Sequence, residues 1–287
     1  MAVHLDRPTQ KTIPVPIEFG ARSDKGCVRE NNEDSYCAAP EMGLYVLSDG
    51  MGGMACGEVA SRLAVDTIIE HCRESEVNPA LPIVGGSIAG VSDTSNRLAS
   101  AVRLANRAVY EASRQSVGKQ PMGATVVAIR LADERVSIAH VGDSRAYRLR
   151  NDQIEQLTQD HSFVAEEVRR GRMTEEEAGN SRLQNVLVRA LGIDASVEVS
   201  VGEELVTDED TLLLCSDGLT RELSDAQIAA LLAGGGDPQR VANHLIETAK
   251  QAGGGDNITA IVLRCAPRSI GVLARIGRLG KWLKDSA

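Results

Sequence analysis

Four short apolar runs that each adjoin an aspartate constrain this 287-residue chain more than any other feature of it. Three of the runs lead into Asp49, Asp143 and Asp217, and the fourth follows Asp256. A short apolar run bounded by glycine is typical of a buried strand, so each aspartate is predicted to lie at a strand end. Carboxylates brought to one place repel one another and need cations, and all-oxygen ligation favours hard ions such as Mg²⁺ or Mn²⁺.

An ordinary turn is the competing explanation for each of these corners. Asp-Gly is a common turn dipeptide, and any one corner is accounted for in that way. All the corners together, with no His or Cys partner at metal-ligand spacing, favour a carboxylate metal centre. The residues alone leave both interpretations open.

Composition predicts a globular protein and excludes some classes of partner. The chain is 43% hydrophobic and 25% charged, and no Pro/Ser-rich linker separates the candidate ligands at positions 49 to 256. The net charge of −9 and the pI of about 5.2 argue against nucleic-acid binding. The six cysteines contain no Cys-x-x-Cys pair, which predicts reduced thiols and a cytoplasmic protein. We expect neither a signal peptide nor a transmembrane segment, because no apolar run reaches roughly 18 residues.

Strands in two groups separated by helices favour an α/β sandwich over a regular βαβ alternation. The polar segment 158–190 interrupts the strand pattern and is predicted to be a mobile flap. Asn151-Asp152 is a hairpin signal, and Ser224 with Gln227 forms a capping box. The other predicted elements are helices over about 58–73 and 95–117, a loop over 74–94, strands over 124–130 and 136–141, and a helix from Asp237-Pro238 to before Gly253.

The two ends of the chain are predicted to lie outside the catalytic core, as an N-terminal tail over 1–16 and a basic C-terminal tail over 268–287. Basic and apolar residues alternate between Arg275 and Lys284, so this tail is a candidate amphipathic helix for a partner or a membrane surface. Interior glycines weaken that pattern, and packing on its own domain remains an alternative.

Arg29 lies close to the acids Glu33 and Asp34. Such a group is usually a surface ion-pair cluster. In a hydrolytic metal site, a guanidinium has another use, because its planar fork of donors binds a phosphate in a bidentate manner.

Six motifs occur in the order typical of the metal-dependent protein phosphatases, and the chain resembles the prokaryotic branch of this protein phosphatase 2C family over a catalytic domain at 17–267. The motifs are Arg29-x-x-x-Glu33-Asp34, Ser48-Asp49-Gly50-Met51-Gly52-Gly53, Met122-Gly123-Ala124-Thr125, Val141-Gly142-Asp143-Ser144-Arg145, Ser216-Asp217-Gly218 and Gly255-Asp256-Asn257-Ile258-Thr259. The resemblance implies an α+β fold, a four-layer αββα sandwich in which helices flank two central antiparallel β-sheets and the metal site lies at one edge.

The resemblance also implies a role for each matching residue. The carboxylates of Asp49, Asp217 and Asp256 and the backbone carbonyl of Gly50 would hold two Mg²⁺ or Mn²⁺ ions. Glu33 and Asp34 would reach these two ions. Asp143 would hold a third, weaker ion. Arg29 would bind the phosphate, Asn257 would be a polar neighbour, and the flap with Asp160, His161 and Ser162 would border the substrate cleft.

The implied activity is hydrolysis of phosphoserine and phosphothreonine in proteins by a water that bridges two ions, with no phosphoenzyme. A cognate Ser/Thr kinase and its targets are natural candidates for partners. One departure concerns the proton for the leaving oxygen, because Met51 stands where some members carry a histidine. A metal-bound water or His161 could replace it, although a structural role for His161 is the alternative.

Three rival interpretations remain. Cys215 to Arg221 fits the Cys-x-x-Gly-x-x-Arg loop of thiol phosphatases, although Asp217 inside it would repel a phosphate dianion. Gly52 to Gly57 has the glycine spacing of a nucleotide P-loop, but Glu58 stands where that loop needs lysine. The third is a phosphatase-fold scaffold or regulatory module that binds phosphoproteins with little or no catalysis.

Overall fold

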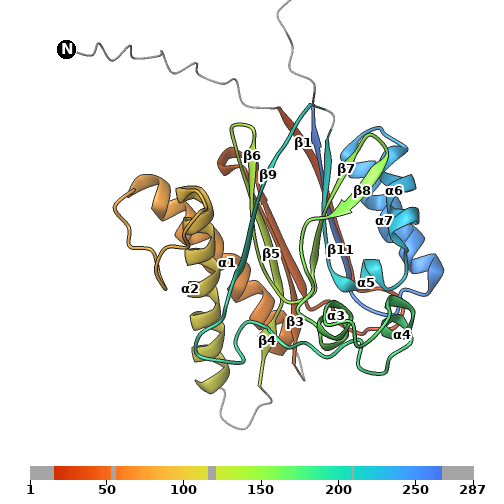
Figure 1. Cartoon of the computed structure of the whole chain (residues 1–287), viewed down its shortest axis with the longest axis horizontal. Coiled ribbons are helices and arrows are strands. Elements are labelled where there is room, and N and C mark those ends of the chain that lie inside the picture. The colour runs from red at the N-terminus through yellow and green to blue at the C-terminus, as the bar shows by residue number, and fades with distance from the viewer. Residues whose placement is uncertain (1–15, 53–55, 116–120, 209, 267–287) are drawn as a thin grey trace, which may run out of the picture.

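The computed structural model describes residues 16–52, 56–115, 121–208 and 210–266. Two antiparallel sheets lie face to face, and helices cover the outer face of each (Figure 1). The predicted four-layer αββα sandwich is therefore confirmed. Both predicted tails lie outside the described residues, apart from Pro16, as does the predicted end of the second helix at 116–117.

The first sheet has the strand order β2-β3-β5-β6-β9, and β4 pairs with β3 beside that path. The bounds of its strands are β2 Asp34–Ala39, β3 Leu44–Met51, β4 Gly123–Ala124, β5 Val126–Ala132, β6 Arg135–Val141 and β9 Ser200–Leu205. The second sheet has the order β1-β11-β10-β7-β8. Its bounds are β1 Ile17–Asp24, β7 Arg145–Arg150, β8 Gln153–Gln156, β10 Thr211–Cys215 and β11 Ile258–Cys265.

The helices α1 and α2 cover the first sheet, α6 and α7 cover the second, and α3, α4 and α5 lie at one end of the sandwich (Figure 1). Their bounds are α1 Cys56–Val77, α2 Asp93–Gln115, α3 Phe163–Arg169, α4 Glu175–Gly179, α5 Asp217–Thr220, α6 Asp225–Ala233 and α7 Pro238–Ala252, with a short 3₁₀ turn η1 at Pro40–Met42.

Local sequence signals set several of these boundaries. Asn151 and Asp152 have φ angles of 50° and 62°, the left-handed pair that a two-residue hairpin requires. The predicted Ser224 capping box is present at α6, and the Asp237 side chain accepts from the Gln239 N–H at the start of α7. The predicted end of the first helix near residue 73 is wrong, because α1 continues to Val77. Ser75 in this last turn is buried, and its hydroxyl donates to the Cys72 carbonyl.

Successive side chains along each strand point to opposite faces of the sheet. They fill three apolar layers, one between the two sheets and one between each sheet and its helices. On β10, Leu213 contacts the α6/α7 layer, whereas Leu212 and Leu214 point to the other sheet. On β3, Leu44 and Val46 face α1 and α2, and Tyr45 and Leu47 face the second sheet. Aliphatic side chains supply most of this core because the chain contains few aromatic residues.

The antiparallel register brings distant acids to one end of the sandwich. Asp34 is paired with Asp49 across β2 and β3. Cys215 at the end of β10 lies opposite Ala260 near the start of β11, so the segments that carry Asp217 and Asp256 are neighbours. The predicted strand-end location of the acids is thus a direct result of the strand order.

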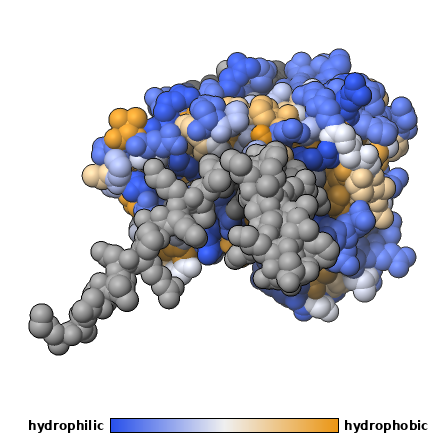
Figure 2. Space-filling view, turned by 90° about the horizontal axis from the view of Figure 1, so that it is seen from above, coloured by the Kyte–Doolittle hydropathy of each residue, from blue (hydrophilic) through white to orange (hydrophobic). Residues whose placement is uncertain are grey.

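Where the described residues are visible in Figure 2, hydrophobic patches lie among mainly hydrophilic side chains. In the described part of the chain, no helix is both long and apolar enough to cross a bilayer.

Substitution of Gly20 tests how tightly α7 packs on β1. A Cβ atom at this position would lie 2.2 Å from the backbone nitrogen of Gln239, so Gly20→Ala should shift α7 and lower the free energy of unfolding by about 1–3 kcal/mol. Gly202→Ala in β9 is the control, because no atom lies within 4 Å of its added methyl group. Urea denaturation that finds both variants equally stable would contradict this packing.

Candidate metal centre

Asp34 is a buried carboxylate that only two hydroxyl groups partly satisfy. Its Oδ2 accepts from the hydroxyls of Ser216 and Thr259, at 2.9 and 2.6 Å. Its Oδ1 is buried and has no hydrogen-bond partner among the described residues. Burial, with a contribution from Asp217, raises the pKa of Asp34 to about 7.

Asp49 in β3 and Asp217 at the start of α5 share a side-chain hydrogen bond, although β3 and the strand β10 that precedes α5 belong to different sheets. Burial followed by the charge of Asp34 raises the pKa of Asp49 well above its usual value. Burial also raises the pKa of Asp217, whose Oδ1 is a second buried oxygen without a partner in the described structure. Thr125 holds the backbone of Asp49 through bonds of 3.1 and 2.8 Å.

Asp256 is held by two guanidinium groups. Its Oδ2 accepts from Arg29 and from Arg221, each at 2.9 Å, and its Oδ1 accepts from the Asn257 N–H. Arg221 also forms an ion pair with Asp217, so its guanidinium bridges the two acids.

The close approach of Gly50 to Gly57 brings the Gly50 carbonyl near Glu33. A Cβ on Gly50 would lie 2.0 Å from the carbonyl oxygen of Gly57, so no larger residue fits at this crossing. The Glu33 carboxylate accepts from the Gly57 N–H at the start of α1, and burial raises the pKa of Glu33.

Asn257 fixes the loop that carries Glu33. Its Oδ1 accepts from the Glu33 N–H at 2.8 Å, and its Nδ2 donates to the carbonyls of Lys25 and Asn31 at 3.2 and 2.9 Å. The side chain therefore positions the loop between β1 and β2.

Asp143 lies at the junction of the acids and the flap. Burial, followed by the charge of Asp217, raises the pKa of Asp143 to about 7. A cavity of about 300 Å³ is lined by both acids together with Arg145, Asp160 and Ser162. Arg145 forms a forked ion pair with Asp160, whose shortest contact is 2.7 Å. Ser162 caps α3 through the Ala165 N–H.

The residues present fit a group of hard divalent cations. The donors are carboxylate oxygens, two of which are buried without a partner, and burial together with mutual repulsion keeps the pKa values of Asp34 and Asp49 high. As the side chains lie, no three His, Cys, Asp or Glu residues in the described ranges already form a metal-binding arrangement.

Comparison with known proteins agrees with the geometry. The family model described as Protein phosphatase 2C matches residues 28–252. The chain belongs to the protein phosphatase 2C family. The matched range contains Arg29 and the acids from Glu33 to Asp217, and it ends just before Asp256.

The relatives of this protein phosphatase 2C chain include bacterial proteins. It is 34% identical to the serine/threonine phosphatase Stp of Listeria innocua over 84% of this chain and 93% of that protein. It is 37% identical to the serine/threonine protein phosphatase PstP of Mycobacterium tuberculosis over 87% of this chain and 45% of that protein. A structure of the catalytic domain of PstP in complex with two manganese ions matches with a TM-score of 0.74 at 36% identity, over 88% of this chain and 99% of that one.

Several residues of this phosphatase-family site escaped the sequence prediction. Ser216 and Thr259 belong to the family motifs, but the motifs do not predict that they bind Asp34. Arg221 belongs to the rival thiol motif, and its spacing of four residues from Asp217 is the sequence signal for their contact.

The thiol alternative is disfavoured by the environment of Cys215. This residue is fully buried, and burial raises the pKa of its thiol to about 12, whereas a nucleophilic cysteine needs a lowered pKa.

His161 is built into the base of the flap. Its Nδ1 accepts from the Gly142 N–H at 3.1 Å, its Nε2 lies 2.9 Å from the Ser200 hydroxyl, and its ring stacks on His140 at 4.8 Å. Burial lowers the pKa of His161 to about 3. These contacts favour a structural role over proton donation to the leaving oxygen.

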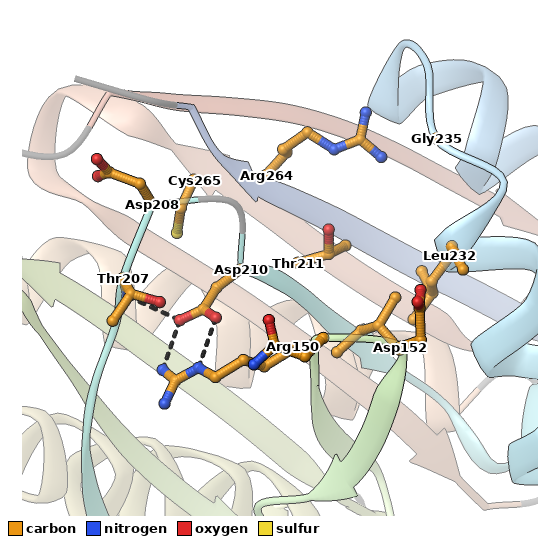
Figure 3. Close-up of a pocket in the computed structure, with 13 residues that line it drawn as sticks. Arg150, Asp152, Thr207, Asp208, Asp210, Thr211, Leu232, Gly235, Arg264 and Cys265 are labelled. Carbon is orange, nitrogen blue, oxygen red and sulfur yellow. Dashed lines mark hydrogen bonds and ion pairs between the residues drawn. The ribbon is translucent and has the colours of Figure 1, made fainter. Parts of the chain in front are cut away.

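A larger cavity of about 680 Å³ lies away from the acids of the family site. Figure 3 shows it between the β7–β8 hairpin, the start of β10, the end of β11 and the end of α6. Arg150 is bonded there to Asp210 at 2.6 and 2.7 Å. Thr211 at the start of β10 lines this cavity, whereas Asp217 lies just after the end of β10. The two sites are therefore at opposite ends of the strand.

Removal of His161 should change the pH dependence of stability. Its pKa is lower in the folded state than in the unfolded chain, so the unfolded chain takes up the proton first as the pH falls below about 6.5. The wild type should therefore lose about 2 kcal/mol more stability than His161→Gln between pH 7 and pH 5. Urea denaturation at both pH values measures this difference, and exposed His244→Gln controls for the loss of a histidine. Equal slopes for wild type and His161→Gln would contradict the assignment.

Proposed function

We propose that the protein is a metal-dependent serine/threonine protein phosphatase. The observation that carries this proposal is the group of carboxylates at one end of the sandwich, with two buried oxygens that lack partners and with Arg29 beside them. Family membership and the names of the bacterial relatives support the same activity.

The site residues keep the roles that the family pattern assigns to them. Asp49, Asp217, Asp256 and the Gly50 carbonyl would hold two core ions, with Glu33 and Asp34 close to them. Asp143 would hold a third ion. When bound, Mg²⁺ or Mn²⁺ supplies a water of lowered pKa and neutralises charge on the phosphate.

Arg29 is suited to bind the phosphate group of the substrate. Its side chain is 54% exposed, so it can turn towards a ligand, and its ion pair is with Asp256, one of the acids that would hold an ion. A guanidinium that binds two phosphate oxygens orients phosphorus for attack and stabilises the charge of the transition state.

Phosphoproteins are the proposed substrates. The flap and a groove of about 430 Å³ that contains Met51, Val188 and Ile193 support this class, because they leave room beside the acids for a protein segment. Val188 and Ile193 are 45% and 52% exposed and could contact apolar residues of a substrate. A cognate kinase and its targets, with a role in signal transduction, remain predictions.

The remaining assignments are also proposals. The catalytic domain at 17–267 is supported by the pairing of Ile17 with Cys265 across β1 and β11. Action in the cytoplasm is supported by six free cysteines, four of them buried. Docking of a partner or a membrane surface by residues 268–287 rests on their sequence alone.

The proposed activity is tested with an aryl phosphate and a phosphothreonine peptide in the presence of Mn²⁺ or Mg²⁺. We expect turnover that a chelator abolishes and that thiol alkylation leaves largely intact. Activity that resists the chelator but not alkylation would favour Cys215 chemistry. Absence of turnover in folded, metal-bound protein would favour the scaffold alternative.

Asp217→Asn should lower kcat by at least about 100-fold, because a ligand shared among the ions loses its charge. The variant should remain folded by circular dichroism, since it loses a source of repulsion rather than an apolar contact. Asp93→Asn at the start of α2 is the control for loss of an acid, because the Asp93 side chain is 73% exposed. An unchanged kcat for Asp217→Asn would remove this residue from the centre.

Asp143→Ala should separate a third ion from the two core ions. We expect that the tight binding stoichiometry is retained, that one weak site is lost and that kcat falls by about 10-fold or more. Equilibrium dialysis with Mn²⁺ measures the stoichiometry alongside the kinetics. If both the weak binding and the rate equal those of the wild type, the third site does not involve Asp143.

A further inference from the structure

Arg221 occupies a fixed position beside the candidate metal centre. It follows α5 directly, and its backbone N–H donates to the Asp217 carbonyl at 2.9 Å. The side chain therefore begins one helical turn from Asp217 and is directed along the same face of the short helix.

The guanidinium of Arg221 spans two of the proposed metal ligands. One amino group is paired with Asp217 Oδ2, and the other donates to Asp256 Oδ2 at 2.9 Å. A guanidinium can bind two carboxylates at once because its donors form a planar fork. A divalent cation that coordinates Asp217 and Asp256 through these Oδ2 atoms would compete with the guanidinium for them.

Neighbouring contacts keep the Asp256 loop in place without this bridge. The Glu222 carboxylate accepts from the Gly255 N–H at 2.8 Å, and the Asn257 side chain fixes the other side of the loop. The bridge of Arg221 is therefore not needed to locate Asp256. The Arg221 side chain is 31% exposed and also lines the cavity of about 300 Å³ beside the flap, which gives it room to turn away.

We propose that Arg221 is a built-in counter-ion that competes with divalent cations for Asp217 and Asp256 and thereby sets the metal concentration at which the site loads. The inference rests on the proposed phosphatase function and adds regulation to the same site. A cation that takes the bridged Oδ2 atoms of both acids must displace the guanidinium, so its affinity is reduced by the free energy of the bridge.

Metal binding by isothermal titration calorimetry tests this competition with Mn²⁺ as the probe. Arg221→Gln should bind Mn²⁺ about three- to tenfold more tightly than the wild type, a range that allows for the partial exposure of the bridge. Arg221→Lys keeps the charge but loses the fork, and its affinity should be intermediate. Arg130→Gln is the charge-matched control, because Arg130 pairs with Glu76 and lies opposite Leu44, at the far end of β3 from Asp49.

Thermal denaturation provides a readout that a merely structural arginine would not give. With chelator, Arg221→Gln should have a lower Tm than the wild type, because the buried Asp217 and the partly buried Asp256 lose the counter-ion that they share. With saturating Mn²⁺ this deficit should disappear, since the ions replace the guanidinium. A deficit of equal size in both conditions would identify a structural role and overturn the inference.

Three calorimetric results would also overturn it. Equal Mn²⁺ affinity in wild type and Arg221→Gln would exclude competition. An equal gain in affinity for Arg130→Gln, or an Arg221→Lys variant that matches the wild type, would assign the effect to net charge rather than to the bridge. Absence of Mn²⁺ binding in every variant would overturn the metal-dependent function itself, so the two failures are distinguishable.

Discussion

Repulsion among buried carboxylates is the constraint on which this structure depends. Asp34, Asp49, Asp143 and Asp217 lie at one end of the sandwich, and burial with mutual charge raises the pKa of each. A group of this kind is tolerated only with hydrogen-bond donors or positive charge nearby. Here the hydroxyls of Ser216 and Thr259 and the guanidinium of Arg221 supply part of that compensation, and divalent cations would supply the rest.

The two sheets make this concentration of charge possible. The three apolar layers fix the strands over most of their length, so the strand ends have little freedom to move apart. The antiparallel register places the end of β10 beside the start of β11 and pairs Asp34 with Asp49. The free energy of the core thus stabilises an arrangement of acids that would not form in a flexible chain.

The sequence predicted those features that depend on local patterns or on ordered motifs. The apolar runs that end in aspartate predicted the strand ends, Asn151-Asp152 predicted the hairpin, and Ser224 predicted the start of α6. The motifs together with the family resemblance predicted the four-layer sandwich. The roles of the individual acids remain predictions, although the structure brings their side chains together.

These sequence patterns do not predict contacts between segments that are distant in the chain. Asn257 is bonded to the backbone of Asn31, 226 residues earlier in the chain. The bridge from Arg221 to Asp256 joins residues 35 positions apart. The end of α1 was missed because it depends on the burial of Ser75. The hydrophobic pattern of a segment predicts which of its faces is buried. It does not predict which other segment packs against that face, and these contacts depend on that packing.

The flap is coupled to the metal centre by the residues on either side of Asp143. Gly142 exchanges two hydrogen bonds with His161, at 2.9 Å through the backbone and 3.1 Å through the ring, and Arg145 holds Asp160. Asp143 therefore lies on a loop that is bonded to the flap both before it, at Gly142, and after it, at Arg145. Asp160 and His161 lie at the start of the flap, so these contacts hold its first residues against the loop that carries Asp143. A displacement of these two residues would therefore be transmitted to the Asp143 loop.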